Sequence, residues 1–433
     1  MNIVLLSGGS GKRLWPLSND IRSKQFIKLF KYGDSYESMV QRVYRQLKEV
    51  DSKSKITIAT SKSQVSIINN QLGDNVSISV EPCRRDTFPA IALSAAFLYY
   101  EKNVDLNESI VVCPVDPYVE FSYFECIKEI SDHVQKQKSN ITLMGIEPTN
   151  ASTKFGYIIP ENNEKISKVV GFKEKPSEVL AKKYIQKGAL WNGGVFAFKL
   201  GYIIDKAHEL INFIDYQDLY NKYEFLEKIS FDYAVLESEK YIEVIRYKGI
   251  WEDLGTWNTF VSAMEDSIIG NAIIDDFSIN TNIVNELDIP ILCLGMKDCI
   301  ISASPDGILI SDKDLSSEIK GYVERINRPT MYAEKSWGQY KVIDAQDNSL
   351  TIKINLKKGH EMNYHSHQFR NEVWTILSGE AKAIINDREY NLQAGDTMQI
   401  PQGTKHKLYA KTDLQVIEIQ SGKDISKSDK IKY

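Results

Sequence analysis

Residues 2–18 read NIVLLSGGSGKRLWPLS, and this stretch indicates the fold of the first half of the chain. The run Asn2–Leu6 is apolar and predicts a buried β-strand. Three glycines and two cations follow it at once: Gly8, Gly9, Gly11, Lys12 and Arg13. Glycine lets the backbone turn tightly and bring its N–H groups close to a ligand, and the cations add positive charge there. The sequence therefore predicts a strand that leads into a phosphate-binding loop.

Two familiar phosphate loops do not match this stretch. A dinucleotide-binding fingerprint would have glycine at position 14, which is Leu14, and a Walker loop would have Ser or Thr where Arg13 stands. A glycine-rich turn without a ligand is the remaining alternative. Lys24, in the sequence Ser23-Lys24-Gln25-Phe26, adds a further cation and argues against that alternative.

Farther along, short β-prone runs alternate with helix-patterned stretches up to about Glu265. In Ser38–Val50, for example, apolar residues recur with a 3.6-residue period, as in a helix that lies on a sheet. The other runs are Ile56–Ala59, Val76–Val80, Pro89–Tyr100, Ile110–Cys113, Phe121–Gln137 and Ile141–Met144. This alternation predicts βαβ units in an α/β domain whose sheet is mostly parallel and covered by helices.

The rest of the chain has a different texture. Residues 266–325 are rich in Ile, Asn, Asp and Ser with short β-prone runs, and they predict a β-rich connector that becomes helical only at Glu318–Val323. From Tyr340 to Gln420, β-type segments separated by turn residues predict an all-β barrel. The tail Ser421–Tyr433 has four lysines and few apolar residues, so we expect it to be frayed and solvated.

Composition excludes several classes of protein. The 433 residues are 42% hydrophobic and 26% charged with a formal charge of −5, which is typical of a folded chain without general attraction to nucleic acid or anionic membranes. No signal-peptide core or membrane span is present, so we expect a cytosolic protein. Five cysteines without CxxC spacing predict free thiols, not disulfides or a thiolate zinc site.

A histidine cluster marks the predicted barrel. His365 and His367 stand two residues apart, so on a strand both would point to the same face. Neighbouring strands can add Glu372 and His406, and three imidazoles with one carboxylate suit Zn²⁺, Fe²⁺, Mn²⁺ or Ni²⁺. The alternative is a set of polar residues that line the barrel without a metal.

The glycine loop followed by Ser23–Phe26 resembles the signature of the sugar-phosphate nucleotidyltransferases, and Trp15 with Lys24-Gln25-Phe26 is similar to their mannose-1-phosphate guanylyltransferase branch. Further matching segments follow in order over residues 1–265: Glu81-Pro82, Arg85–Ile91, Pro114–Asp116, Phe155–Ile158, Phe172–Pro176, Trp191–Gly194, Phe231–Ala234 and Trp251–Trp257. The resemblance implies a Rossmann-like mixed sheet and a transfer of a nucleotidyl group, most readily GMP from GTP, to a sugar 1-phosphate such as mannose 1-phosphate.

The same resemblance implies roles for individual residues. Catalysis would fall to Arg13 and Lys24, which face the phosphates, and to Asp116 and Asp253, which would hold Mg²⁺. The nucleotide would be bound by Gly8, Gly9, Ser10, Gly11, Lys12, Glu81, Arg85, Thr87 and Pro89. The sugar phosphate would be bound by Gly156, Glu174, Lys175, Asn192 and Gly193. Ser7, Lys12 and Asp86 depart from the residues common in the family, which leaves the nucleotide and the sugar open; a manno-heptose 1-phosphate is the alternative substrate.

The histidine segment resembles the two cupin motifs, with Ala410 in place of the usual last Asn. A transferase joined to a cupin is similar to the bifunctional type II phosphomannose isomerase and mannose-1-phosphate guanylyltransferase family. His365, Val373 and Lys407 replace the family's Gln, His and Arg, so two alternatives stay open: a mannose-6-phosphate isomerase, or a non-catalytic cupin that binds a sugar nucleotide and regulates the transferase. We expect a transferase domain at 1–265, a connector at 266–325, a cupin at 326–433 and a homo-oligomer.

Overall fold

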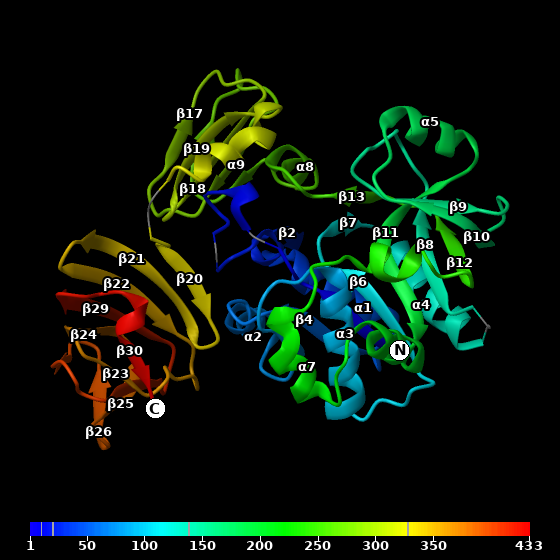
Figure 1. Cartoon of the computed structure of the whole chain (residues 1–433). Helices are drawn as coiled ribbons and strands as arrows, with labels where there is room; N and C mark the ends of the chain where they lie inside the picture. The colour runs from blue at the N-terminus through cyan, green and yellow to red at the C-terminus, as the bar shows by residue number, and fades with distance from the viewer. Residues whose placement is uncertain (10, 20, 137–138, 327–328) are drawn as a thin grey trace.

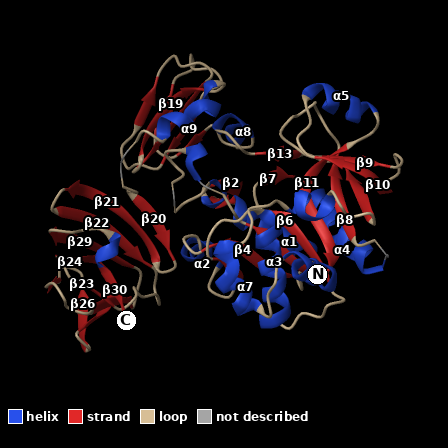
Figure 2. Ribbon diagram, viewed as in Figure 1, coloured by secondary structure: helices blue, strands red, loops and turns tan. Residues whose placement is uncertain are grey.

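The computed structural model describes residues 1–9, 11–19, 21–136, 139–326 and 329–433. Figure 1 shows three parts: an α/β body, a small β-rich part beside it, and a C-terminal barrel. Figure 2 shows helices on both faces of the sheet of the body, whereas the barrel consists almost entirely of strands. The predicted fold class is therefore confirmed.

The body is built on a nine-stranded sheet with the order β5-β4-β1-β6-β11-β8-β12-β10-β9. Its strands are β1 (Asn2–Leu6), β4 (Lys55–Ser61), β5 (Ser77–Glu81), β6 (Ser109–Pro114), β8 (Ile141–Ile146), β9 (Tyr157–Pro160), β10 (Ile166–Lys173), β11 (Leu190–Lys199) and β12 (Ile242–Tyr247). The sheet is mixed, as the resemblance implies, so the expectation of a mostly parallel sheet holds only in part. Strands β5, β4, β1 and β6 run parallel, as do β8 and β12, but β11 lies antiparallel between β6 and β8, and β9 and β10 form an antiparallel pair. A short connection such as that between β9 and β10 can join only antiparallel neighbours.

Each face of the sheet has its own hydrophobic core. Ile3 and Leu5 of β1 point into one core and Val4 points into the other, because successive side chains of a strand alternate. Helices α1 (Met39–Val50) and α4 (Phe121–Lys136) cover the first face. Helices α3 (Thr87–Ala96), α6 (Leu200–Leu210) and α7 (Tyr216–Lys222) cover the second. The predicted helices at 38–50 and 121–137 are confirmed over the residues described. The predicted helix at 89–100 is also confirmed: it consists of α3 and a π-helical turn, Phe97–Glu101, that follows it directly.

Ser38 shows why α1 begins where it does. Its hydroxyl accepts from the backbone N–H of Gln41, and the Gln41 side chain accepts from the backbone N–H of Ser38. This reciprocal capping box satisfies two donors that a helix start leaves unpaired. The body also contains the helices α2 (Val65–Leu72), α5 (Glu178–Gln186) and α8 (Trp257–Ser262). Two small sheets complete it: a hairpin of β2 (Lys28–Tyr32) and β3 (Ser35–Ser38), and a pairing of β7 (Pro117–Val119) with β13 (Trp251–Asp253), which are far apart in the chain.

The connector consists of short strands in two small sheets that pack against each other. One sheet contains β14 (Ile268–Ile269), β16 (Asn282–Asn285), β18 (Cys299–Ser304) and β19 (Gly307–Asp312), and the facing sheet contains β15 (Ala272–Ile274) and β17 (Ile291–Cys293). A small core of Ile283, Cys293, Cys299 and Ile301 lies between them. The short helix α9 (Ile319–Val323) packs into the main core of the body, as do Val284 and Ile300. The prediction of a β-rich connector that ends in a helix is confirmed.

The C-terminal barrel is made of two facing sheets. The first contains β20 (Tyr332–Lys335), β21 (Gly338–Gln346), β22 (Ser349–Leu356), β29 (Leu414–Gly422), β24 (Arg370–Ser378) and β27 (Thr397–Ile400), and the second contains β26 (Arg388–Gln393), β25 (Glu380–Ile385), β28 (His406–Ala410), β23 (His365–His367) and β30 (Lys430–Lys432). The expectation of a frayed tail is wrong. Strand β30 pairs with β23, and the buried Asp429 carboxylate accepts from the backbone N–H groups of Gln368 and Phe369.

Arg22 lies where the three parts meet. Its guanidinium donates twice to the Glu286 carboxylate of the connector, with both N···O distances 2.8 Å, and its Nε lies 3.8 Å from Glu334 of β20. Arg22 is 4% exposed, so this ion pair is shielded from water. All five cysteines are free thiols, as predicted. Among the described residues, no helix is both long enough and apolar enough to cross a membrane.

Candidate functional sites

The glycine loop leaves the carboxyl end of β1 with its shape fixed by neighbouring side chains. The Gly9 carbonyl accepts from Ser23 Oγ at 3.2 Å and from Arg84 Nη2 at 2.8 Å. Gly9 has a φ of 130°, and a Cβ there would meet no atom within 4 Å, so conformation and not crowding demands glycine. Ser10 lies outside the described residues, and of Lys12 only the backbone is described. Gly8 and Gly9 are exposed, so the loop presents its backbone to the surface.

Lys24 brings two distant carboxylates together. Its ammonium lies 3.0 Å from Asp116 Oδ2 and 3.6 Å from Asp253 Oδ1, and it donates to the Leu254 carbonyl at 3.1 Å. Asp116 stands between β6 and β7, and Asp253 ends β13. Because β7 and β13 pair with Asp253 opposite Pro117, the small sheet places the two carboxylates side by side. Both are partly exposed and can reach a ligand.

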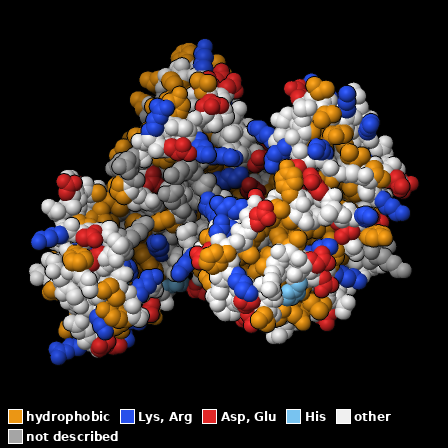
Figure 3. All heavy atoms as spheres, in the orientation of Figure 1, with side chains coloured by type: hydrophobic (Ala, Val, Ile, Leu, Met, Phe, Trp, Pro, Cys, Tyr) orange, Lys and Arg blue, Asp and Glu red, His pale blue; other side chains and the backbone are white. Residues whose placement is uncertain are grey.

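Arg13 joins this group from the glycine loop. A Cβ added to Gly255 would lie 3.4 Å from Asp253 Oδ2 and 3.8 Å from Arg13 Nη1. Arg13 and Asp253 therefore border the same small residue. The four residues that the sequence nominated for catalysis lie in one cluster beside the glycine loop, and Figure 3 shows Lys and Arg side chains gathered on this face where the parts of the molecule meet. Two carboxylates of this kind form a hard-oxygen donor set that fits Mg²⁺.

The segment from Glu81 to Pro89 is held against the loop and the second core. Glu81 accepts from Tyr223 OH at 2.8 Å, and burial raises the pKa of the Glu81 carboxyl. Thr87 Oγ1 accepts from the Phe231 N–H at 2.8 Å, and Pro89 is buried in α3. Thr87 and Pro89 thus hold the start of α3. The Arg85 Nε is buried without a hydrogen-bond partner among the described residues.

Arg84 is a residue that the sequence reasoning missed. Its guanidinium bonds to the Gly9 carbonyl and so ties the 81–89 segment to the phosphate loop. The adjacent Asp86 has a left-handed φ of 70° and accepts from the Thr87 N–H at 2.7 Å. Left-handed non-glycine residues are uncommon, and they cluster at functional sites. The doubled arginine at 84–85 was the signal available in the sequence.

The residues nominated for the sugar phosphate also converge. Glu174 Oε1 lies 2.7 Å from Lys175 Nζ, and a Cβ at Gly156 would lie 2.5 Å from Glu174 Oε2 and 3.5 Å from Asn192 Cβ. The Asn192 N–H donates to the Gly156 carbonyl at 2.8 Å. A Cβ at Gly193 would lie 2.9 Å from Ile146, so that position has no room for a side chain. Lys175 has a left-handed φ of 40°.

Asp232 completes this group, although the sequence reasoning gave it no role. It accepts from Asn192 Nδ2 at 2.6 Å. Burial, with the nearby charge of Glu174, raises the pKa of the Asp232 carboxyl to about 6. Its presence in the matching segment Phe231–Ala234 was the available signal. A ring cluster of Phe155, Trp191 and Trp251, with centroids 5.0 to 6.2 Å apart, connects the sugar side to β13 and its Asp253.

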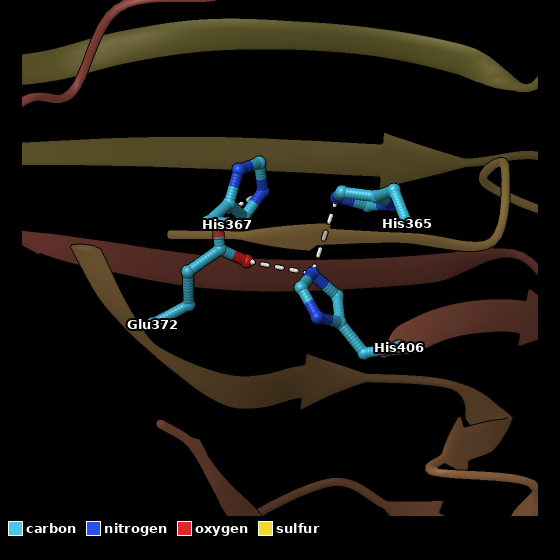
Figure 4. A group of neighbouring side chains, drawn as sticks. All are labelled: His365, His367, Glu372 and His406. Carbon is cyan, nitrogen blue, oxygen red and sulfur yellow. Dashed lines mark hydrogen bonds and ion pairs between the residues drawn. The ribbon is translucent and has the colours of Figure 1, made fainter. Parts of the chain in front are cut away.

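The barrel contains a second cluster. Ligand atoms of His365, His367, Glu372 and His406 all lie within 4.8 Å of one another, and Figure 4 shows the side chains pointing toward one another. Glu372 Oε1 is 3.1 Å from His367 Nε2, and Glu372 Oε2 is 3.2 Å from His406 Nε2. Strands β23, β24 and β28 supply the residues, and all four side chains are buried.

The second ring nitrogens of the three histidines face the backbone. Nδ1 of His365, His406 and His367 lies 2.6, 2.9 and 3.2 Å from the carbonyl oxygens of Asn363, Thr404 and Asp429, respectively. A carbonyl only accepts, so each Nδ1 carries the proton and each Nε2 presents a lone pair to the cluster. This donor set fits a divalent transition metal. Arg370, which donates to Glu372 Oε1 at 3.2 Å and to His367 Nε2 at 3.0 Å, holds the same groups from one side.

The cluster borders a cavity of about 720 Å³ in the barrel. Glu418 also lines it, and burial together with the charge of Glu372 raises the pKa of the Glu418 carboxyl to about 7. The sequence reasoning missed Glu418, although its spacing of two and four residues from Val416 and Leu414 puts it on the same inward face of β29. The cation of Lys353 lies on the other face of β22, because its neighbours Ile352 and Ile354 line the cavity instead.

Comparisons with known proteins match both parts of the chain that contain these clusters. The family model described as nucleotidyl transferase matches residues 2–268, and the one described as mannose-6-phosphate isomerase C-terminal matches residues 325–433. The chain is 28% identical over 470 residues to mannose-1-phosphate guanylyltransferase RfbM of Salmonella typhimurium, covering 99% of this chain and 96% of the relative. It is 28% identical over 469 residues to the alginate biosynthesis protein AlgA of Pseudomonas aeruginosa, covering 98% and 95% of the two chains.

A solved structure shows the same fold. The crystal structure described as mannose-1-phosphate geranyltransferase from Thermus thermophilus superimposes with a TM-score of 0.63 and 26% sequence identity. The match covers 75% of this chain and 98% of that chain.

Proposed function

Since the chain belongs to the nucleotidyl transferase family and is a sugar-phosphate nucleotidyltransferase, we propose that it transfers GMP from GTP to mannose 1-phosphate, giving GDP-mannose and pyrophosphate. Relatives named mannose-1-phosphate guanylyltransferase, which match over 99% of the chain, support this choice of substrates. The observation that carries the proposal is the meeting of Lys24, Asp116 and Asp253 beside the glycine loop.

The reaction needs positioning and charge neutralisation more than a protein nucleophile. A phosphate oxygen of the sugar 1-phosphate bonds to the α-phosphorus of the nucleotide. The bond between that phosphorus and the bridging oxygen breaks, and its electron pair leaves with pyrophosphate. The backbone of the glycine loop binds the triphosphate, and Arg13 and Lys24 offset the negative charge that moves toward the leaving group.

Asp116 and Asp253 are the residues that would hold Mg²⁺. The metal would supply positive charge against the phosphates of both substrates. On the sugar side, the Glu174 carboxylate accepts hydrogen bonds from hydroxyl groups of the sugar, and the Asn192 amide exchanges hydrogen bonds with them. Lys175 forms an ion pair with the phosphate of the sugar. Asp232 accepts from the amide of Asn192 and so fixes the orientation of that side chain toward the sugar.

The direct test is pyrophosphate release by the full chain with Mg²⁺ and mannose 1-phosphate, measured with GTP, ATP, UTP, CTP and dTTP in turn. We expect release with GTP. Release with another nucleotide would change the base assigned to the site. Silence with all five, followed by release with a manno-heptose 1-phosphate, would transfer the proposal to that sugar.

For the barrel, we propose a metal-dependent isomerase that interconverts mannose 6-phosphate and fructose 6-phosphate. The buried cluster of three histidines and Glu372 beside a 720 Å³ cavity supports this, together with the match to a mannose-6-phosphate isomerase model. The bound metal would polarise the sugar carbonyl. The reaction moves one proton between C1 and C2, and the Glu418 carboxylate, which lines the cavity, is the chain's own candidate to carry that proton.

Metal content and isomerisation of the full chain test this second proposal. We expect about one Zn²⁺, Fe²⁺, Mn²⁺ or Ni²⁺ per chain, lost together with isomerisation on His406→Ala. Transfer of GMP should persist in that variant. A bound metal without isomerisation, combined with tight binding of GDP-mannose in the barrel, would favour the regulatory cupin instead. We also propose that the protein is cytosolic and that it associates into a homo-oligomer. Light scattering on the purified chain tests the self-association.

A further inference from the structure

The barrel does not enclose its cavity alone. Ser66, in the first turn of α2 in the transferase body, is one of the residues that line it. Helix α2 lies beside β20 of the barrel, as Figure 1 shows. The turn between β20 and β21, with Lys335, Ser336 and Trp337, forms another part of the cavity wall.

A single residue of α2 holds that turn in place. Asn70 Nδ2 donates to the Lys335 carbonyl at 2.6 Å and to the Gly338 carbonyl at 2.8 Å. In return, Lys357 Nζ of the barrel donates to the Asn70 carbonyl at 3.0 Å and to its Oδ1 at 3.1 Å. The Asn70 amide therefore spans the turn that carries Ser336 and Trp337.

The next residue strengthens the contact. Gln71 Nε2 donates to Glu334 Oε2 of β20 at 3.1 Å and to the Phe26 carbonyl at 2.9 Å, and its Oε1 accepts from Ser38 Oγ at 2.6 Å. Gln71 and Glu334 are buried. Buried polar groups with all partners present fix one arrangement of the parts they join. The cavity wall is thus positioned by the transferase body.

The two ends of the cavity offer different groups to a ligand. At its inner end, the carboxylates of Glu372 and Glu418 lie beside the cations of Arg370 and Lys430, since Arg370 donates to Glu372 at 3.2 Å and Lys430 stands in β30, which pairs with β23. The wall nearest the body has the hydroxyls of Ser66 and Ser336, together with Lys335. Hydroxyl and ammonium groups donate hydrogen bonds, so this part of the wall suits a phosphate group.

We propose that the barrel's sugar-phosphate site is completed by the transferase body: the phosphate group binds at the junction between α2 and the barrel, where Ser66 borders it and Asn70 positions the Lys335–Gly338 turn around it. This inference rests on the proposed binding of mannose 6-phosphate by the barrel. It adds a specificity residue and a positioning residue that lie outside the barrel.

Charge substitutions at Ser66 test the placement of the phosphate. In the full chain, Ser66→Glu should weaken the binding of mannose 6-phosphate at least tenfold by calorimetry, and Ser66→Lys should tighten it. The metal content and GMP transfer should not change in either variant. Ser63→Glu and Ser63→Lys, at an exposed serine one turn earlier that does not line the cavity, are the matched controls. Equal weakening by both charges at Ser66 would show a steric effect and overturn the placement.

Asn70→Ala tests the positioning. We expect a higher KM for mannose 6-phosphate with a smaller change in kcat, and faster hydrogen exchange in peptides that cover 333–340. Unchanged exchange and unchanged KM would overturn the role of Asn70 while the isomerase proposal stands. If the wild-type chain binds no mannose 6-phosphate at all, both the isomerase and the phosphate placement fall, whereas the exchange result still reports on the contact itself.

Discussion

Asp253 and Arg13 border the same glycine although they are far apart in the chain, and each is expected to act on the phosphates. Asp253→Asn keeps the size of the side chain but removes a charge, and Arg13→Ala removes the cation. We expect each change to lower the rate of GMP transfer at least tenfold, because charge neutralisation is the main contribution to this chemistry. Pyrophosphate release measures the loss, and unchanged thermal unfolding shows that the fold is intact. A variant that keeps more than about a tenth of the wild-type rate would remove its residue from the mechanism.

The raised pKa of Asp232 predicts that the stability of the folded chain depends on pH. Its pKa is raised from 3.8 to about 6 by burial and Glu174, so between these values the folded chain binds a proton that the unfolded chain releases. Its contribution to stability is therefore full below about pH 4 and is lost as the pH rises through 6. Asp232→Asn stays neutral and keeps an oxygen that can accept from Asn192. The unfolding temperature of the variant relative to wild type should rise between pH 4 and pH 7, and a difference that does not vary with pH would contradict this origin.

Most individual site residues could be predicted from the sequence, because each stands in a short segment with its own pattern. Lys24, Asp116 and Asp253 are examples: the structure brings the two carboxylates to the Lys24 ammonium, and the roles of the three residues stay predictions. Asp232 and Glu418 could not be assigned in this way, because their altered pKa values depend on burial by residues distant in sequence.

At the scale of single elements, the hairpin of β9 and β10 sets the position of Glu174. Gly156 precedes β9, and a methyl group there would lie 2.5 Å from Glu174 Oε2 and 2.9 Å from Phe172 Cζ. Gly156→Ala should therefore push the carboxylate away from the sugar. We expect KM for mannose 1-phosphate to rise about tenfold or more, the usual cost of a hydrogen bond to a charged group. Gly171→Ala on the same hairpin is the control, since its Cβ would lie at an ordinary 3.4 Å from Ile159. Equal effects of the two changes would contradict the assignment.

Elements with a strong local pattern agree with the sequence-based expectation. The period of α1, the strand β1 and the turns of the barrel all depend on neighbouring residues. The antiparallel course of β11 and the pairing of β30 with β23 were not predicted, because both depend on partners that no local pattern identifies.

At the scale of the whole molecule, the ion pairs of Arg22 with Glu286 and Glu334 are expected to stabilise the contact between the three parts. Arg22→Ala leaves Glu334, 4% exposed, without its cation and removes both hydrogen bonds to Glu286. We expect a loss of roughly 3 kcal/mol in urea unfolding, as for other broken buried pairs. Lys31→Ala breaks a partly exposed pair with Asp266 and should cost less than about 1 kcal/mol. Similar midpoints for the two variants would show that Arg22 does not hold the parts together.

Helix α2 also serves the phosphate loop, since Gln64 at its start donates to Ser23 Oγ at 2.8 Å, and that hydroxyl donates to the Gly9 carbonyl. The two turns of this helix thus contact two sites at once. A mutation in the helix can therefore affect both the transferase and the barrel, which links the evolution of the two halves of the chain. A chimaera that joins this transferase half to the barrel of another protein would therefore need a barrel that offers Asn70 and Gln71 the same hydrogen-bond acceptors as this one.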